Sequence, residues 1–110
     1  MKTHQLIEAT CPDCRGPMSV NDHDGLREYC CLVGHAYSAA GLLQAHSEAQ
    51  EKAIWSAVVA LEEATKLVEA VASDLPPAMV ERLEQQAKLK RQQALEIRGV
   101  LERLEPFGVE

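Results

Sequence analysis

The chain has 110 residues, enough for one domain or two very small units. It carries 11 basic and 17 acidic residues, and both the first 37 residues and the remainder have an acidic surplus. Nucleic acids and anionic membranes attract Lys and Arg, so the composition disfavours both as partners. The N-terminus lacks the apolar stretch of a signal peptide, and the longest apolar run, Ala57–Leu61, is far shorter than a membrane span. We therefore expect a cytoplasmic protein that uses neither a membrane nor a nucleic acid.

Residues 1–37 contain all four cysteines of the chain. Thiols stay reduced in the cytoplasm, so clustered cysteines there favour metal binding over disulfides. Cys11 and Cys14 form a C-x-x-C pair, whose spacing lets two thiolates converge on one ion. Next, Met18–Asn21 is typical of a short strand, Asp22–Gly25 of a turn, and Leu26–Cys30 of the returning strand. This hairpin is expected to bring the following residues back to the first pair.

A second ligand pair, Cys31 and His35, follows the predicted hairpin. Together with Cys11 and Cys14 it makes a Cys₃His set, which suits tetrahedral Zn²⁺ and leaves no coordination position for water. Residues 1–37 have few large apolar side chains, so metal binding is expected to supply much of their folding free energy, on the order of 10 kcal/mol. The sequence therefore predicts a zinc-ribbon-like unit with one structural Zn²⁺ and no small-molecule substrate.

The choice of ligands leaves alternatives open. Cys30 and Cys31 are adjacent, and on an extended segment their side chains point to opposite sides, so only one is expected to ligate. Cys31 is favoured because it shares a turn with His35. The other imidazoles are interpreted as surface or helix-face residues: His4, His23 and His46. A rival hypothesis is thiol redox chemistry through Cys11 and Cys14, although the expected thioredoxin-like pattern is absent.

Residues 38–105 are rich in good helix formers and predict an antiparallel two-helix hairpin. Ser38 is a natural N-cap for a first helix over Ala39–Ser73, which Pro76 and Pro77 end. Its main apolar stripe has spacings of three and four and a second column beside it. The stripe is Leu42, His46, Ala49, Ala53, Ala57, Ala60, Ala64, Leu67 and Val71, and the column is Leu43, Ile54, Leu61 and Val68.

A second helix is predicted over Ala78–Leu104, with Pro77 at its first position. Its apolar stripe alternates strictly between spacings of three and four, and only Lys90 interrupts it. The stripe is Val80, Leu83, Ala87, Lys90, Ala94, Ile97, Leu101 and Leu104. The apolar face of the first helix is wider than a two-helix seam needs, which predicts a further partner: the metal-bound half, a second copy forming a four-helix bundle, or both. Residues 106–110 are expected to be a loose tail.

Three segments of the chain resemble a known family. They are Cys-Pro-Asp-Cys-x-Gly-Pro from Cys11, Gly-Leu-Arg-Glu-Tyr-Cys-Cys-Leu-Val-Gly-His-Ala-Tyr-Ser from Gly25, and Ile-Trp-Ser-Ala-Val-x-Ala-Leu-Glu-Glu from Ile54. Over about residues 10–70 the chain is similar to the C-terminal region beyond the catalytic domain in some bacterial chemotaxis-type protein-glutamate methylesterases. Cys30 departs from that family's pattern, in which a residue other than cysteine is usual.

The resemblance implies a role in chemotaxis-type signalling without catalysis. The family's esterase uses a Ser-His-Asp triad on a large α/β domain, and no serine here lies in a nucleophile elbow. We expect a non-enzymatic, zinc-stabilised module for protein interaction or oligomerisation, with a protein partner or a second copy. Trp55 and Val59 lie off the main apolar stripe and, with Leu89, are the expected interface residues. The alternatives are a nucleic-acid-binding zinc ribbon and a thiol redox protein.

Overall fold

The computed structural model describes residues 3–109. Met1, Lys2 and Glu110, at the ends of the predicted metal-binding unit and tail, lie outside the described residues, as do the side chains of His4 and His23. The chain is α+β and forms two compact units. One reaches to Gln50 and includes the chain from Glu105 onward, and the other is Glu51–Leu104.

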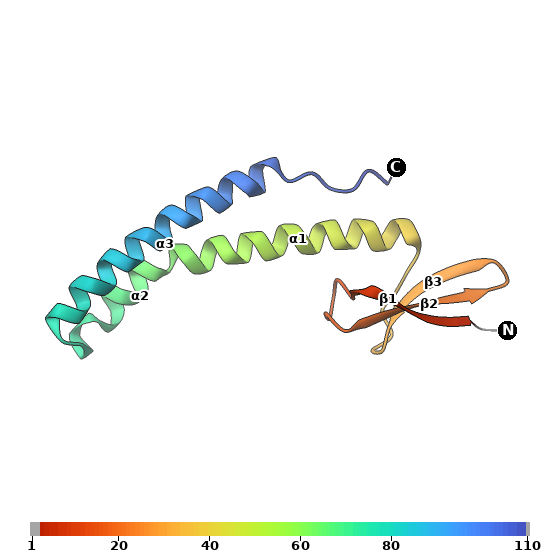
Figure 1. Ribbon diagram of the computed structural model, residues 1–110, viewed down its shortest axis with the longest axis horizontal. Helices are drawn as coiled ribbons and strands as arrows, with labels where there is room; N and C mark the ends of the chain where they lie inside the picture. Colours follow the sequence, from red (N-terminus) through yellow and green to blue (C-terminus); the bar gives the residue numbers. More distant parts are fainter. Residues whose placement is uncertain (1–2, 110) are drawn as a thin grey trace. The chain divides into compact units, whose positions relative to one another are not determined.

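The first unit is built on a four-stranded antiparallel sheet in which each strand pairs with the next along the chain (Figure 1). The inner strands confirm the predicted hairpin, but two further strands flank it that the sequence pattern did not predict. The predicted small α+β class is confirmed. The predicted sheet of a single hairpin is incomplete, because the sheet has four strands. The strands are β1 (Thr3–Thr10), β2 (Pro17–His23), β3 (Leu26–Cys31) and β4 (Ala36–Tyr37).

The turn between β2 and β3 consists of two residues, because His23 pairs with Leu26. Asp24 and Gly25 both have positive φ, 52° and 86°, as a type I′ turn requires. The Gly25 N–H donates to Oδ1 of Asp22 at 3.2 Å. This turn fixes the register of the hairpin, which places Met18 opposite Cys31.

The core of the first unit is small. Cys11, Met18 and Cys31 are buried, and four half-buried side chains pack against them: Ile7, Tyr29, Tyr37 and Leu42. Leu6 and Leu26 are 71% and 77% exposed, so they add little to this core. Val20 of β2 is buried as well, but two of these four buried apolar residues are cysteines, so few large apolar groups are available to hold the sheet together.

Helix α1 (Ala39–Glu62) begins at the predicted N-cap. The Gly41 N–H donates to Oγ of Ser38 at 3.0 Å and so satisfies one of the free donors of the first turn. Further along, Ser47 is buried, donates to the Leu43 carbonyl and accepts from the N–H of Phe107 at 3.0 Å. The ring of Phe107 lies 6.2 Å from that of His46, so the chain end contacts α1.

The prediction of one unbroken helix over Ala39–Ser73 is wrong. The helix is interrupted at Glu63, resumes as α2 (Ala64–Val71) and tightens to a 3₁₀ turn, η1 (Ala72–Asp74). Glu63 has a ψ of −18° but keeps both of its i→i−4 bonds, to Val59 at 3.0 Å and from Leu67 at 2.9 Å, so the interruption is confined to one residue. Leu75 then becomes extended because it precedes Pro76, and proline disfavours the helical conformation of the residue before it.

Helix α3 (Pro77–Arg103) matches the predicted second helix to within one residue at each end, and Pro77 occupies its first position. It runs back beside α2 and the end of α1 (Figure 1). Ala87 and Ala94 are buried, Lys90 is exposed, and the other stripe residues are half-buried, which confirms the predicted face. Within residues 3–109, none of the helices combines the length and apolarity needed to cross a bilayer.

The predicted packing face of α1 needs a correction. Val58 is fully buried, with Ile54 and Leu61 half-buried beside it, whereas Ala53, Ala57 and Ala60 of the predicted stripe are exposed. Of the column expected to flank the stripe, Ile54 and Leu61 therefore lie at the centre of the packing face, together with Val58, which the prediction placed in neither column. Burying Val, Ile and Leu removes more apolar area from water than burying alanines does. This difference decides which face of α1 packs against its neighbours.

The Gly25→Ala variant tests the hairpin turn. An added Cβ would meet no atom within 4 Å, so its cost arises from the positive φ alone. We expect the sheet to lose about 1–2 kcal/mol of stability, measured by amide hydrogen exchange of the metal-loaded protein. Asp24→Gly, at the other positive-φ position, is the matched control and is expected not to destabilise the turn. Equal exchange in Gly25→Ala and the wild type would contradict the turn assignment.

Candidate metal centre

Two tight turns carry the predicted ligands. In the first, the Arg15 N–H donates to the Cys11 carbonyl and the Cys11 N–H to the Gly16 carbonyl, both at 2.8 Å. Arg15 has a φ of 63°, which lets the chain reverse directly after Cys14. The turn exposes Cys14 and buries Cys11, and it brings their sulfurs within 4.8 Å of each other.

The second turn repeats this pattern. The Gly34 N–H donates to the Cys31 carbonyl at 3.2 Å, and the Cys31 N–H donates to the His35 carbonyl at 3.1 Å. Gly34 has a φ of 109°, a value that L side chains rarely adopt, and this allows the turn just before the histidine. The β2–β3 hairpin joins the two turns, so closing the hairpin brings them together.

All four predicted ligands meet: the ligand atoms of Cys11, Cys14, Cys31 and His35 lie within 4.8 Å of one another. The two sulfurs of Cys14 and Cys31 are 3.6 Å apart. Nδ1 of His35 lies 3.4 Å from Sγ of Cys31 and 3.6 Å from Sγ of Cys11. These four side chains are the one group of this kind among the described residues that could hold a metal ion.

The spacing of these atoms fits a tetrahedral ion. With metal–sulfur and metal–nitrogen bonds of about 2.3 and about 2.05 Å, a regular tetrahedron has sulfur–sulfur edges of about 3.8 Å and sulfur–nitrogen edges of about 3.6 Å. The three separations given above lie within a few tenths of an ångström of those edges, and all four atoms lie within 4.8 Å of one another. None of the four cysteines is disulfide-bonded. The donor set therefore suits one metal ion, and three sulfurs with one imidazole favour Zn²⁺ among the common divalent ions.

The backbone prepares two thiols for ligation. Burial opposes ionisation of Cys31, but the N–H groups of His35 and Val33 outweigh it and lower the pKa of the thiol to about 6. Burial likewise opposes ionisation of Cys11, whose pKa is nevertheless lowered by the N–H groups of Cys14 and Asp13. The same contacts that shape the turns therefore favour the thiolates that a metal needs.

The remaining two ligands respond to those thiolates. The Gly16 N–H favours the Cys14 thiolate, but burial and the neighbouring sulfurs of Cys31 and Cys11 outweigh it and raise the pKa of Cys14. Hydrogen bonds to Cys31 and Cys11 raise the pKa of His35. Both shifts arise in part from the neighbouring sulfurs of Cys11 and Cys31, whose negative charge a divalent cation at the centre would neutralise.

Tyr37 is a supporting residue that reasoning from ligand spacing missed. Its hydroxyl donates to the carboxylate of Asp13, and its oxygen lies 3.8 Å from Sγ of Cys11. The hydrogen bond to Asp13 raises the pKa of Tyr37. Tyr37 therefore ties β4 to the first turn and orients a ligand, as second-sphere partners commonly do. Its position two residues after His35 was the available signal.

Cys30 lies outside the cluster. Its thiol donates to Glu28 at 3.2 Å and lies 3.6 Å from the side-chain amide of Asn21. Burial, reinforced by Glu28, raises its pKa, which disfavours the thiolate that a metal requires. The expected alternation of Cys30 and Cys31 across the strand is therefore present, with Cys31 on the side of the other ligands.

The three predicted interface residues lie in the other unit. Trp55 is 47% exposed and stacks on the guanidinium of Arg98, whose carbon lies 5.1 Å from the ring centroid. Arg98 also pairs with Glu62 at 2.6 Å. Val59 is half-buried and lines a hollow with Leu95, while Leu89 is 61% exposed on α3. Trp55 and Leu89 are therefore accessible to a partner, and Val59 is partly so.

Comparisons of the chain with protein-family models, curated proteins and solved structures found no match in any of the three. The resemblance to the methylesterase C-terminal region therefore stays a prediction.

Replacing the adjacent cysteines one at a time tests the ligand set. Cys31→Ser removes a sulfur from the cluster, so we expect bound metal to fall from about one ion per chain to well below that, as measured by native mass spectrometry. Cys30→Ser is the matched control and should keep its metal. The reverse result would assign the third ligand to Cys30.

The Glu62–Arg98 pair predicts a small pH dependence. Arg98 lowers the pKa of Glu62, so the pair stabilises the helical unit above the ordinary carboxyl pKa, and this contribution is lost as pH falls through the lowered value. Both side chains are more than a third exposed, so Glu62→Gln should cost under about 1 kcal/mol at neutral pH. Urea unfolding followed by Trp55 fluorescence should show wild type and variant converging at acidic pH. Glu84→Gln, at an unpaired exposed site, is the control, and a pH-independent difference at Glu62 would contradict the prediction.

Proposed function

We propose that this chain is a zinc-stabilised protein-interaction module without catalytic activity, acting beside bacterial chemotaxis-type signalling proteins. The observation that carries the proposal is the convergence of the ligand atoms of Cys11, Cys14, Cys31 and His35 to within 4.8 Å of one another. A Zn²⁺ ion held by four protein ligands has no open position for water or substrate, which supports a structural rather than a hydrolytic role.

The size of the sheet's core supports the same role. Four buried apolar side chains, two of them cysteines, and four half-buried neighbours give little apolar area for a four-stranded sheet. A bound Zn²⁺ would join the two tight turns and supply the missing stabilisation. The product would be a rigid sheet linked to exposed helices, an arrangement suited to presenting surfaces to another protein.

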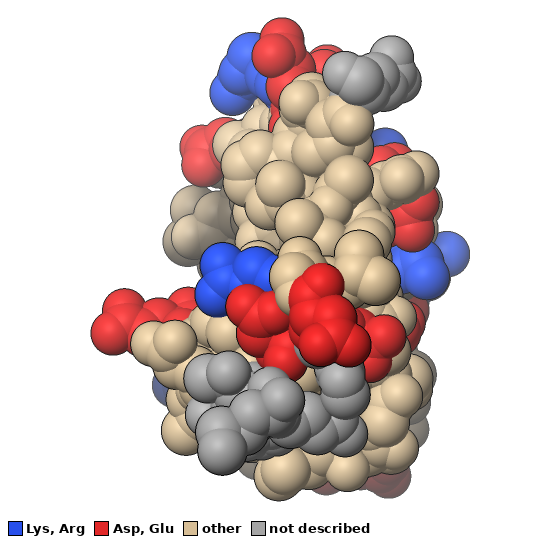
Figure 2. Space-filling model, turned by 90° about the vertical axis from the view of Figure 1, so that its right-hand side faces the viewer, with Lys and Arg blue, Asp and Glu red and all other residues tan. Residues whose placement is uncertain are grey.

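The charge of the sheet favours a protein partner over a nucleic acid. Its described basic residues are Arg15 and Arg27, against five acids: Glu8, Asp13, Asp22, Asp24 and Glu28. On the face shown in Figure 2, the Lys and Arg side chains are separate from one another, whereas several Asp and Glu side chains gather together. A phosphate backbone needs a continuous basic surface, which this distribution does not offer.

The link to chemotaxis-type signalling comes from the resemblance over residues 10–70. Trp55 is the side chain we assign to a signalling partner, because its ring is half exposed yet held in place by Arg98. Fixed aromatic side chains bind partners with a small loss of conformational entropy, and Trp is enriched at interface hot spots.

Metal removal tests the proposal. The purified chain should contain about one zinc ion, and a strong chelator should unfold the sheet while leaving most helical circular dichroism intact. Adding Zn²⁺ back should restore the sheet, and Mg²⁺, which prefers oxygen ligands, should not. A metal-free sample with full amide protection over residues 3–37 would contradict the proposed role of zinc.

A further inference from the structure

The outer side of α3 carries a stripe of exposed residues with a symmetric order. Leu89 lies at its centre. On each side of Leu89 a glutamine comes first, then a charged residue and then a small apolar residue. The charged residue is basic on one side and acidic on the other. The spacings are also symmetric, at four, three and four residues on each side. The stripe is Ala78, Arg82, Gln85, Leu89, Gln93, Glu96 and Val100.

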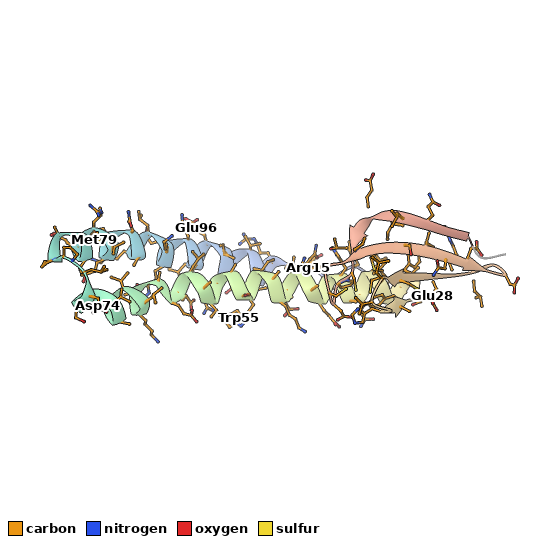
Figure 3. The ribbon with its side chains drawn as sticks, turned by 90° about the horizontal axis from the view of Figure 1, so that it is seen from below. Arg15, Glu28, Trp55, Asp74, Met79 and Glu96 are labelled. Atoms are coloured by element: carbon orange, nitrogen blue, oxygen red, sulfur yellow. The ribbon has the colours of Figure 1, made fainter. Side chains whose placement is uncertain are left out.

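This stripe is unpartnered within the chain. All seven residues are exposed, with Leu89 at 61% and Val100 at 47%, although large apolar residues are costly to leave in water. The face of α3 that packs within the hairpin is a different one, marked by the buried Ala87 and Ala94. In Figure 3, Glu96 projects from α3 on the edge away from α1, whereas Trp55 projects from the far edge of α1.

We infer that this chain forms a two-fold symmetric dimer in which the α3 stripe packs antiparallel against the same stripe of a second copy, centred on Leu89. The two-fold operation places Leu89 on Leu89 and Arg82 of each copy beside Glu96 of the other, so the ion pair forms twice. Gln85 meets Gln93 in the same way, and Ala78 meets Val100. The inference deepens the proposed interaction role by naming a second copy as one partner.

The charges of the stripe complement those of an identical stripe, which identifies a second copy of this chain as the partner. Each chain carries a net charge of −6, so two copies repel each other unless they meet through a surface where charges are absent or paired. The stripe meets this condition, because its two charged residues have opposite signs and equal distances from the centre. An unrelated partner would gain nothing from that symmetry, whereas a second copy uses every position twice.

The available area suits a weak, concentration-dependent dimer. From Ala78 to Val100 the stripe is about 33 Å long, at 1.5 Å per residue. With a width of about one helix, or about 10 Å, each copy offers about 330 Å², and the total of about 660 Å² lies below the standard size of specific interfaces. The exposed alanines of α1 add to this area only near Val100, because α1 ends at Glu62, which pairs with Arg98.

Charge reversal and its repair test the inference. Sedimentation velocity over a concentration series should show a monomer–dimer equilibrium for the wild type. Arg82→Glu and Glu96→Arg each create two like-charge pairs and should raise the dimer dissociation constant at least about tenfold. The double variant R82E/E96R restores opposite charges and should return the constant to near the wild-type value. Leu89→Asp, which places two carboxylates on the axis, should give monomers.

Glu84→Arg, at an exposed position on another face of α3, is the matched control and should not change the equilibrium. Circular dichroism of every variant should match the wild type, because each changed side chain is exposed. A wild type that stays monomeric at all concentrations, or a dimer insensitive to all three single changes, overturns the inference. Failure of the double variant to recover also overturns it. Zinc content measured on the same samples separates the two proposals, because a zinc-free protein with this charge-dependent dimer would remove only the zinc role.

Discussion

Convergence of four ligand atoms from two tight turns is the constraint on which the first unit depends. Each turn begins with a buried cysteine whose carbonyl and N–H bond within the turn, and each uses a positive φ to reverse the chain. The same backbone N–H groups that close the turns also stabilise thiolates at Cys11 and Cys31. The backbone conformation that shapes the turns therefore also favours the thiolates that a metal would need. The small core around Met18 depends on the same turns.

The ligand set was predictable from the sequence because C-x-x-C spacing, a two-residue turn and a glycine before histidine are all local signals. Leu26 and Gly25 set the register of the hairpin, and that register places Cys31, rather than Cys30, beside the first pair. Strands β1 and β4 were not predictable. β1 carries mostly exposed residues without a regular apolar alternation, and β4 has two residues, so each depends on pairing with a neighbour rather than on its own pattern.

The helices show the same division between local and tertiary signals. Ser38, Pro77 and the stripe of α3 are local features, and the structure has each of them where the sequence predicts. The packing face of α1 is a tertiary choice between a continuous column of alanines and a shorter column with Ile54, Val58 and Leu61. A count of apolar positions favours the alanine column, whereas the apolar area that can be buried favours the branched side chains. The structure packs α1 through the branched side chains, so the buried area determines the packing face. The alanine flank left in solvent is uncharged and lies free for contacts between molecules.

The position of Cys30 has a practical consequence. A metal held by the cluster would engage three of the four thiols, whereas Cys30 points to the other side of its strand, beside Asn21 and Glu28. A thiol reagent applied to the loaded protein therefore has a single attachment point, one residue away from a ligand. A fluorescent or spin label introduced there would sense loss of the ion through the movement of β3, without any cysteine having to be engineered into the chain.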